Sequence, residues 1–382
     1  MKKIIVASDS FKGCLSSLEV ARAAEKGILK VLPDCEVKGI PVGDGGEGTV
    51  EALVAAMNGR FVTCEVHDPL MNPIQVEYGI LGDGLTAVIE MASASGLPLV
   101  PKEKRNPMLT TTYGTGEMIK DALQRGCRHF LIGIGGSATN DAGVGMLQAL
   151  GFRFFDRAGE ELGKGGQVLA QIERIDLTGA LPALQASDFI VACDVTNPFS
   201  GENGAAFIYA RQKGADEQMI RLLDKGLKHF ARIIQETVGK DIDAIPGAGA
   251  AGGLGGGFLA FLPAILKPGI QMVLDAVDFD RHIRNAELII TGEGKLDRQT
   301  GMGKTPAGVL AAGKRHHIPV IAIGGAVEET DALLQQGFMA ALSIQPGPVS
   351  LDQAMNPTFA AQQIERVVEQ IVSIMFNADV HK

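Results

Sequence analysis

Short runs of valine and isoleucine, each followed by an amphipathic stretch, recur at both ends of this chain and restrict its possible folds. Apolar strands that alternate with helices are typical of a parallel sheet covered by helices on both faces. Ser16 followed by Glu19 predicts the start of a helix that reaches about Leu32, and another helix is predicted over 49–57. The predicted strands are residues 4–7, 38–42, 288–290, 319–323 and 340–344.

The middle of the chain follows a different pattern. Residues 74–81 and 87–91 are predicted strands joined by the turn at 82–84, which favours an antiparallel hairpin. Because a hairpin does not belong to a parallel sheet, we predict an α/β fold with two different domains. We expect a ligand site at the crossings between them. The predicted domains are residues 1–62 plus 287–382 and an inserted mixed-sheet domain at 63–286, which includes strands 130–134 and 189–192 and a helix over 140–150.

The composition excludes several classes of partner. The 382 residues include 35 Lys and Arg against 44 Asp and Glu, which gives a net charge of -9. This charge repels polyphosphate backbones and anionic lipid, so we expect neither nucleic acid nor a membrane as partner. The apolar stretch after Lys3 ends at Ser8, which is too short for an export signal. Five cysteines without a close pair are typical of reduced thiols, so we expect a cytoplasmic protein.

Glycine is abundant, with 49 residues, or nearly twice the usual share of about 7%. Glycine-rich loops at helix starts let backbone amides point together at an anion, and the helix dipole favours negative charge there. Phosphate is therefore the natural ligand of such loops, although each single loop is equally explained as a tight turn. The glycine-rich segments are residues 8–13, 43–48, 133–141, 246–257 and 291–306.

Familiar nucleotide and hydrolase motifs fit these segments poorly. Residues 247–252 have the dinucleotide-binding spacing but follow no predicted strand. Residues 303–305 resemble the end of a P-loop, yet Arg298 stands where its first glycine belongs. Thr139 replaces the second glycine of the turn that would present Ser137 as a nucleophile. A dinucleotide-dependent oxidoreductase acting on a small hydroxy acid, and a non-catalytic nucleotide- or carboxylate-binding protein, remain as alternatives.

Acidic residues and a few lysines share these loops. Phosphoryl transfer needs them, because Mg²⁺ takes one or two carboxylates plus phosphate oxygens, a lysine balances developing charge, and an aspartate accepts the hydroxyl proton. Helix capping and Asx turns are the alternative roles, above all for Asp44 and Asp141. Asp194 ends a predicted strand, a frequent position for catalytic acids in α/β sheets. The full set is Asp9 with Lys12, Asp44 with Glu47, Asp141, Asp194, and Glu293 with Lys295 and Asp297.

Segments 9–13, 41–49, 132–143, 192–198, 246–253 and 291–306, in this order, resemble the motifs of the bacterial type I glycerate kinase family, the glycerate 2-kinases. The likeness covers essentially the whole chain. It implies ATP-dependent phosphorylation of D-glycerate with Mg²⁺, usually to 2-phosphoglycerate. It also implies two different α/β domains, one of them flavodoxin-like and assembled from both termini. The sequence departs from the family pattern at Gly43, where alanine is usual, and at 300–303, which puts only local loop shape in doubt.

The resemblance suggests a role for each candidate residue. Asp194 is the first candidate for the general base and Asp297 the rival base, and both are candidate magnesium ligands. Lys12 would neutralise phosphate or the glycerate carboxylate. The predicted substrate-binding residues are Asp9, Ser10, Asp44, Glu47, Ser137, Thr139 and Asn140. The predicted nucleotide-binding residues are Gly249, Gly252, Gly253, Glu293 and Lys295. Association into a homo-oligomer is left open.

Overall fold

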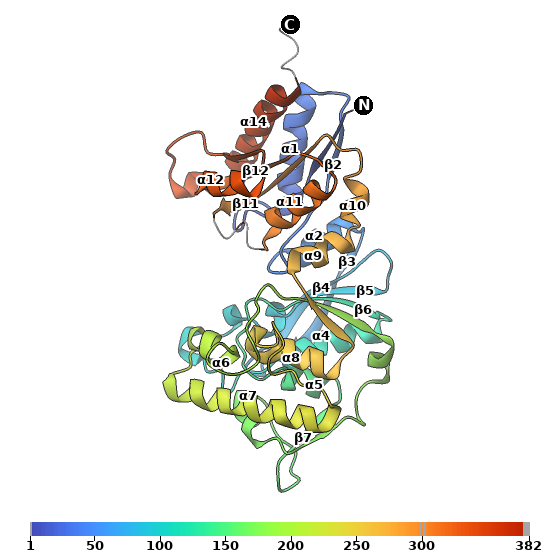
Figure 1. Cartoon of the computed structure of the whole chain (residues 1–382). Helices are drawn as coiled ribbons and strands as arrows, with labels where there is room; N and C mark the ends of the chain where they lie inside the picture. The colour runs from blue at the N-terminus through green and yellow to red at the C-terminus, as the bar shows by residue number, and fades with distance from the viewer. Residues whose placement is uncertain (1, 298–299, 301–302, 377–382) are drawn as a thin grey trace. The chain divides into compact units, whose positions relative to one another are not determined.

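The computed structural model describes residues 2–297, 300 and 303–376, so 298–299 and 301–302 of the last glycine-rich segment lie outside the described residues. The chain forms two compact units (Figure 1). The terminal unit comprises Met1–Asp44, Glu51–Met57 and Gly269–Lys382. The inserted unit comprises Gly45–Val50 and Asn58–Pro268.

The terminal unit contains a five-stranded sheet whose neighbouring strands are all parallel. The central strand places Ile5 opposite Lys38 on one side and Ile289 on the other. Numbered in chain order within this unit, the strands run 2-1-3-4-5, which is the flavodoxin-like order, so the predicted fold of this unit is confirmed. The order is β2 (Glu36–Gly39), β1 (Lys3–Val6), β11 (Leu288–Leu296), β12 (Val320–Val327) and β13 (Ala340–Ser343).

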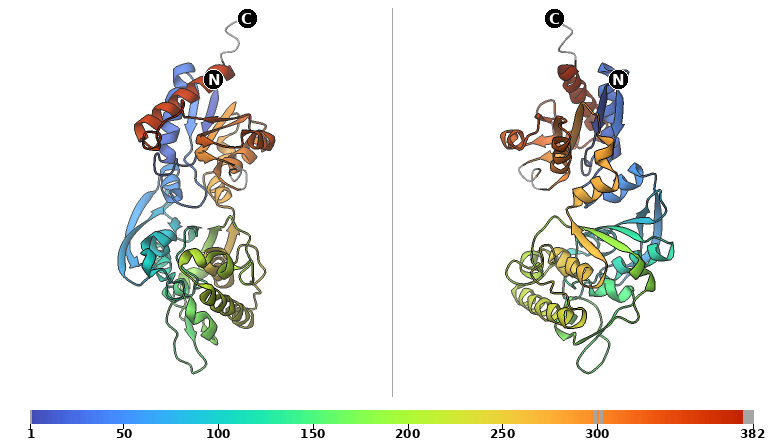
Figure 2. Two further views of the ribbon diagram at one scale, coloured as in Figure 1. Left: turned by 90° about the vertical axis from the view of Figure 1, so that its left-hand side faces the viewer. Right: turned by 45° about the vertical axis from the view of Figure 1, so that its right-hand side comes forward.

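Helices cover both faces of this sheet, because its strands are apolar on both faces. Ile4 and Ile290 belong to the core shared with α1 (Ser17–Val31) and α14 (Pro357–Phe376). Ile289 lies on the opposite face and approaches α11 (Thr305–Arg315). The views in Figure 2 show α1 and α14 side by side on one side of the sheet.

The start of α1 is determined locally by a capping box, as the sequence predicts. The Ser16 hydroxyl accepts a hydrogen bond from the Glu19 amide at 3.3 Å, and the Glu19 carboxylate accepts one from the Ser16 amide at 2.8 Å. Two of the amides that a helix start leaves unpaired are thereby satisfied.

Gly27 allows α1 to pack closely against α14, because a Cβ at this position would lie 2.3 Å from the Glu365 carbonyl oxygen. We expect Gly27→Ala to lower the free energy of unfolding by about 2 kcal/mol, although alanine favours a helix by about 1 kcal/mol. Chemical denaturation measures this. Gly347→Ala is the control, because a Cβ there meets nothing within 4 Å, and equal effects of the two substitutions would contradict the packing argument.

The chain passes from one compact unit to the other between residues 44 and 45, 50 and 51, 57 and 58, and 268 and 269. The helices α9 (Gly269–Ala276) and α10 (Phe279–His282) belong to the terminal unit. Ile270 of α9 packs onto α11, where a Cβ on Gly308 would lie 2.3 Å from its Cγ1 atom. Strand β3 (Arg60–His67) lies wholly in the inserted unit, because all of it pairs with β4 (Pro73–Ile80).

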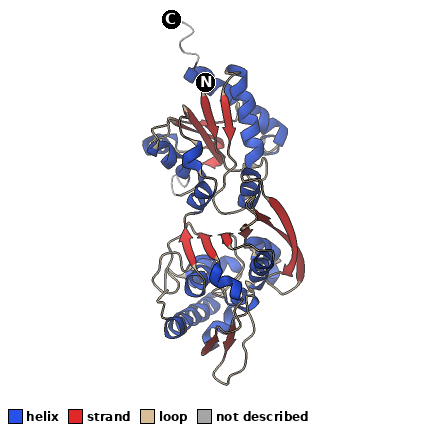
Figure 3. Ribbon diagram, turned by 90° about the vertical axis from the view of Figure 1, so that its right-hand side faces the viewer, coloured by secondary structure: helices blue, strands red, loops and turns tan. Residues whose placement is uncertain are grey.

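The inserted unit has a six-stranded mixed sheet (Figure 3). Its first four strands are parallel, whereas the β5–β4 and β4–β3 pairs are antiparallel, so the predicted hairpin and mixed sheet are confirmed. The order is β10 (Ala264–Lys267), β9 (Asp188–Ala192), β6 (His129–Gly133), β5 (Thr86–Glu90), β4 and β3. A separate antiparallel pair consists of β7 (Arg153–Phe155) and β8 (Arg174–Asp176).

The helix predicted from Asn140 begins later, at Val144. Ala142 and Gly143 have φ values of 52° and 78°, and a helix cannot pass through this left-handed backbone. The remaining helices are α2 (Thr49–Ala56), α3 (Ala92–Ser95), α4 (Tyr113–Gln124), α5 (Val144–Ala149), α6 (Ala205–Tyr209), α7 (Glu217–Val238), α8 (Ala250–Phe261), α12 (Thr330–Gln336) and α13 (Leu351–Ala354). Across the described residues, no helix combines the length and apolar character that a membrane crossing requires.

Candidate functional site

A cavity of about 720 Å³ lies in the terminal unit, where β1, β11, β12 and β13 reach their carboxyl ends. This edge of an open parallel sheet is the usual place for a ligand. The cavity brings together predicted site residues that are far apart in the sequence. Its charged and hydroxyl-bearing lining consists of Asp9, Ser10, Lys12, Asp44, Glu293, Lys295 and Lys304.

Two hydrogen bonds hold the Asp9 carboxylate in this cavity. The carboxylate accepts a hydrogen bond from the Ser10 amide at 2.6 Å and from the Thr305 hydroxyl, at the start of α11, at 2.9 Å. Burial raises the pKa of Asp9 to about 6, and the Asp44 carboxylate adds to that rise. The two hydrogen bonds and Lys12 oppose the rise. A cation at this position would favour the ionised form of Asp9.

Lysines and acids alternate around the same cavity. The Lys12 ammonium lies 4.0 Å from the Asp44 carboxylate, and the Lys304 ammonium lies 3.8 Å from the Glu293 carboxylate. Glu293 also accepts a hydrogen bond from the Thr300 hydroxyl at 2.5 Å, while burial raises its pKa. Sequence reasoning missed Lys304, although it examined this segment as a failed P-loop.

The segment after β11 positions the remaining predicted residues of this unit. The Asp297 amide donates to the Thr300 hydroxyl at 2.9 Å, and the Thr300 amide donates to the Asp297 carbonyl at 3.0 Å. Lys295 lines the cavity, but its ammonium pairs with the exposed Glu328 at 3.0 Å. Of these two lysines, Lys304 is therefore the one that lies nearer to the half-buried Glu293.

The cavity also has an apolar lining, which sequence reasoning missed. Most of its residues, from Ile344 to Met355, follow β13, the last strand of the sheet, and the signal that would have found them is their position after a strand end. The apolar lining consists of Phe11, Cys14, Ala326, Ile344, Pro348, Val349, Leu351, Ala354 and Met355. Together with the charged lining, this makes an amphipathic cavity of the size that holds a small ligand.

The donor set fits a nucleotide and a hard cation. Magnesium in such sites is held by one or two carboxylates together with phosphate oxygens. Asp9 and Asp44 both line the cavity, and they are close enough for the charge of Asp44 to raise the pKa of Asp9. Among residues 2–297, 300 and 303–376, no three or more His, Cys, Asp or Glu side chains form a metal-binding group. An all-protein metal cage is therefore absent from that part of the chain.

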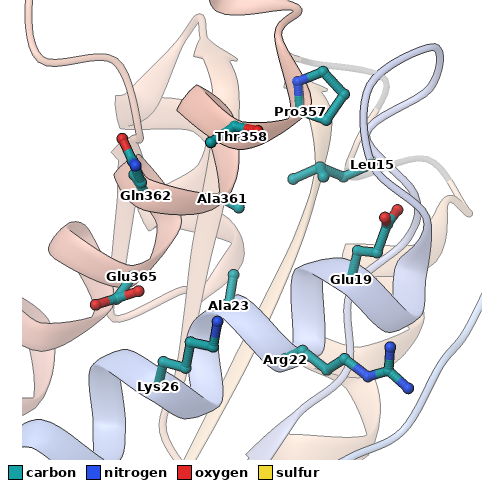
Figure 4. Close-up of a pocket in the computed structure, with 10 residues that line it drawn as sticks. All are labelled: Leu15, Glu19, Arg22, Ala23, Lys26, Pro357, Thr358, Ala361, Gln362 and Glu365. Carbon is teal, nitrogen blue, oxygen red and sulfur yellow. The ribbon is translucent and has the colours of Figure 1, made fainter.

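A second depression in the terminal unit lies between α1 and α14 (Figure 4). Long side chains of Glu19, Arg22, Lys26 and Glu365 stand along it. None of the residues predicted for phosphate or substrate lines it.

In the inserted unit, Ser137, Thr139 and Asn140 follow β6 and are buried. Lys213, from a short turn before α7, donates hydrogen bonds to the Ser137 hydroxyl and to the Thr139 carbonyl, both at 2.6 Å. Burial lowers the pKa of Lys213 to about 7, although Asp141 opposes this shift. Sequence reasoning missed Lys213, since no motif or periodicity surrounds it.

Asp141 has a structural role, like the helix capping or Asx turn that the sequence allowed as an alternative to catalysis. Its buried carboxylate accepts hydrogen bonds from the Thr112 amide at 2.8 Å, the Thr112 hydroxyl at 3.0 Å, and the amides of Gly143 and Gly145 at 3.2 Å. These bonds hold the start of α5 against the segment that precedes α4.

The three glycines predicted to contact a nucleotide have a packing reason of their own. A Cβ on Gly249 would lie 2.1 Å from the Pro198 carbonyl oxygen, and one on Gly252 would lie 2.1 Å from that of Thr139. A Cβ on Gly253 would meet Phe199 at 2.9 Å. The close approach is thus to the chain's own residues, and contact with a nucleotide stays a prediction.

Two further predicted residues lie on exposed loops of the inserted unit. Asp194 follows β9, and Glu47 precedes α2. The structure therefore groups Asp9, Ser10, Lys12, Asp44, Glu293 and Lys295 at one cavity, and Ser137, Thr139 and Asn140 around Lys213.

Comparison with known proteins identifies the family of this chain. Residues 4–376 match the model of the glycerate kinase family. A glycerate kinase from Halalkalibacterium halodurans is 50% identical over 371 residues, which cover 97% of this chain and 96% of that protein. A glycerate 2-kinase from Escherichia coli is 48% identical over 358 residues, which cover 94% of each chain.

A solved structure extends the likeness to the fold. The crystal structure of a candidate glycerate kinase 2 from Salmonella typhimurium LT2 superposes with a TM-score of 0.92 at 42% identity and covers 99% of both chains. The predicted fold class and the predicted enzyme class, a phosphotransferase, are confirmed at the level of the family. This chain belongs to the glycerate kinase family.

Proposed function

We propose that this protein transfers the terminal phosphoryl group of ATP to the 2-hydroxyl of D-glycerate and releases 2-phospho-D-glycerate and ADP. The observation that carries the proposal is the amphipathic cavity of the terminal unit, which is lined by acids and lysines together with apolar side chains. Membership of the glycerate kinase family supports the substrate. The name of the Escherichia coli relative, glycerate 2-kinase, supports the position of phosphorylation.

In this proposal the cavity of the terminal unit binds ATP. Lys12 and Lys304 balance phosphate charge, and Glu293 and Lys295 position the nucleotide. The apolar side chains that follow β13, among them Val349 and Met355, pack against the base. A base and ribose need apolar contact, whereas a triphosphate needs cations, and this cavity offers both.

Asp297 and Asp194 are the proposed magnesium ligands, and Asp9 and Asp44, which line the cavity, are proposed to bind the substrate. Bound Mg²⁺ would neutralise charge on the phosphate oxygens, which is the chemistry that this chain's carboxylates alone cannot supply. The protein's own residues orient the ligands, exclude water and accept the proton.

Asp194 is the proposed general base for the 2-hydroxyl of glycerate, and Asp297 is the rival. Ser137, Thr139 and Asn140 hold oxygens of the substrate, with Glu47 as a further substrate contact. Gly249, Gly252 and Gly253 are the proposed backbone contacts to nucleotide. All five cysteines are free thiols, and together with ATP as donor they support a cytoplasmic enzyme.

The test is an assay of ADP formation by the purified protein with D-glycerate, L-glycerate and glycerol in parallel. We expect ADP to form rapidly with D-glycerate alone, and phosphorus NMR to identify 2-phospho-D-glycerate. Absence of D-glycerate-dependent ADP would overturn the proposal. Formation of 3-phospho-D-glycerate would overturn only the proposed phosphorylation of the 2-hydroxyl. Chelation of Mg²⁺ is expected to abolish turnover.

Lys12 offers a direct test of the nucleotide site. We expect Lys12→Met to raise the KM for ATP by about tenfold, because a charge-assisted contact to phosphate contributes about 1.5 kcal/mol. Steady-state kinetics with varied ATP measures this. Lys30→Met removes an exposed lysine of α1 that pairs with Glu365, and it should leave the KM unchanged. An equal KM for ATP in both variants would show that Lys12 does not bind the phosphates of ATP.

A further inference from the structure

Lys213 is a buried lysine in the inserted unit that the proposed mechanism leaves without a role. Its side chain is only 2% exposed. Its ammonium donates to the Ser137 hydroxyl and the Thr139 carbonyl, and within the described residues no carboxylate lies at ion-pair distance from it. Asp141 contributes only a longer-range attraction.

Such a lysine is costly to the fold. Transfer of an ammonium group from water to a protein interior is unfavourable unless a carboxylate or several strong acceptors compensate it. A methionine of similar length would fill the same space without this cost. Stability therefore gives no reason for an amine at this position, whereas the binding of an anion does.

The hydrogen bonds around Ser137 show where the anion would lie. Because the Ser137 oxygen accepts from the Lys213 ammonium, its own proton is directed to another acceptor. No described residue accepts it. Ser137 follows Gly135 and Gly136, which are both exposed, and a Cβ on Gly135 would meet nothing within 4 Å. The loop surface beside this hydroxyl is therefore open to a small molecule.

Unpaired polar atoms in the same segment also indicate a binding site. The Thr139 hydroxyl and both amide atoms of Asn140 are fully buried and have no hydrogen-bond partner in the described chain. Buried polar atoms in folded proteins are nearly always paired by protein, water or ligand. This segment therefore has the capacity to bind polar groups that the protein itself does not use.

We propose that Lys213 is a positioning residue for the substrate carboxylate, which the Ser137 hydroxyl binds while the buried ammonium supplies the compensating charge. The inference rests on the proposed function, since it names the group of glycerate that this segment recognises. A carboxylate is preferred over a phosphate because its single negative charge matches the single ammonium of this site. The cavity of the terminal unit, by contrast, provides several lysines.

The test compares Lys213→Met, Ser137→Ala and the control Lys225→Met in steady-state kinetics with D-glycerate and ATP varied separately. Lys225 is an exposed lysine of α7, so its replacement removes the same charge from the surface. We expect Lys213→Met and Ser137→Ala to raise the KM for D-glycerate at least tenfold, with little change in kcat and an unchanged KM for ATP. The control should match wild type.

Each alternative outcome is distinct. An unchanged KM for D-glycerate in a folded Lys213→Met enzyme would overturn the inference. A rise confined to the KM for ATP would also overturn it, and would indicate that this site binds a phosphate group of ATP instead of the glycerate carboxylate. If Lys213→Met does not fold, the KM for D-glycerate and the KM for ATP of Ser137→Ala test the inference in the same way. A wild-type enzyme without D-glycerate-dependent turnover would instead refute the proposed function, so the two failures are separable.

Discussion

The Asp194→Asn variant is expected to fold normally and to phosphorylate D-glycerate about a hundredfold more slowly than wild type, or slower still. Asparagine keeps the shape of the side chain but cannot accept the hydroxyl proton at neutral pH. Asp194 is exposed shortly after the carboxyl end of β9, and asparagine has nearly the same size as aspartate, so we expect the fold to tolerate the replacement. The effect should fall on kcat, because the lost interaction belongs to the transition state.

Asp188→Asn is the matched control, because Asp188 begins the same strand and its exposed carboxylate pairs with His129 at 2.6 Å. We expect its kcat to equal that of wild type. A wild-type kcat in Asp194→Asn, combined with a large loss in Asp297→Asn, would transfer the role of base to Asp297. Loss in neither variant would mean that no aspartate of this pair takes the proton.

Lys213 should make the stability of the protein depend on pH in a way that its removal abolishes. The pKa of Lys213 is about 7 in the folded protein, below the value of about 10.4 for a free lysine. The folded state thus disfavours the charged form, and this cost is fully present below pH 7. As pH rises from 7 towards 10, the unfolded chain binds more protons than the folded one, so the free energy of unfolding rises.

The measurement is the free energy of unfolding of wild type minus that of Lys213→Met between pH 6 and pH 10. We expect this difference to increase by several kcal/mol, because each pKa unit corresponds to about 1.4 kcal/mol. Taking the difference removes the groups that both proteins share. A difference that stays constant with pH would show that Lys213 keeps an ordinary pKa.

Features determined by neighbouring residues were predictable from the sequence. The capping box of Ser16 and Glu19 lies within one helical turn, so its residues alone fix the start of α1. The hairpin between β4 and β5 was predictable for the same reason. The late start of α5 was not, because alanine gives no sign that Ala142 adopts a φ of 52°.

Contacts between distant segments were harder to predict. Asp9 was a candidate from its loop, but its hydrogen bond to Thr305 joins residues 296 positions apart and exists because β1 lies beside β11. Lys213 had no signal at all, since it approaches Ser137 from a short turn without periodicity. Residue types suggested the chemistry, whereas the fold decided which groups meet.

The sheet of the terminal unit has a consequence for synthesis on the ribosome. Of the two neighbours of β1, β2 follows it closely in the chain, but β11 begins at Leu288, after the whole inserted unit has been made. At about 5–20 residues per second, translation of the intervening chain takes on the order of 10–50 s. The inserted unit can therefore fold first, while one edge of β1 stays unpaired until the ribosome supplies its partner.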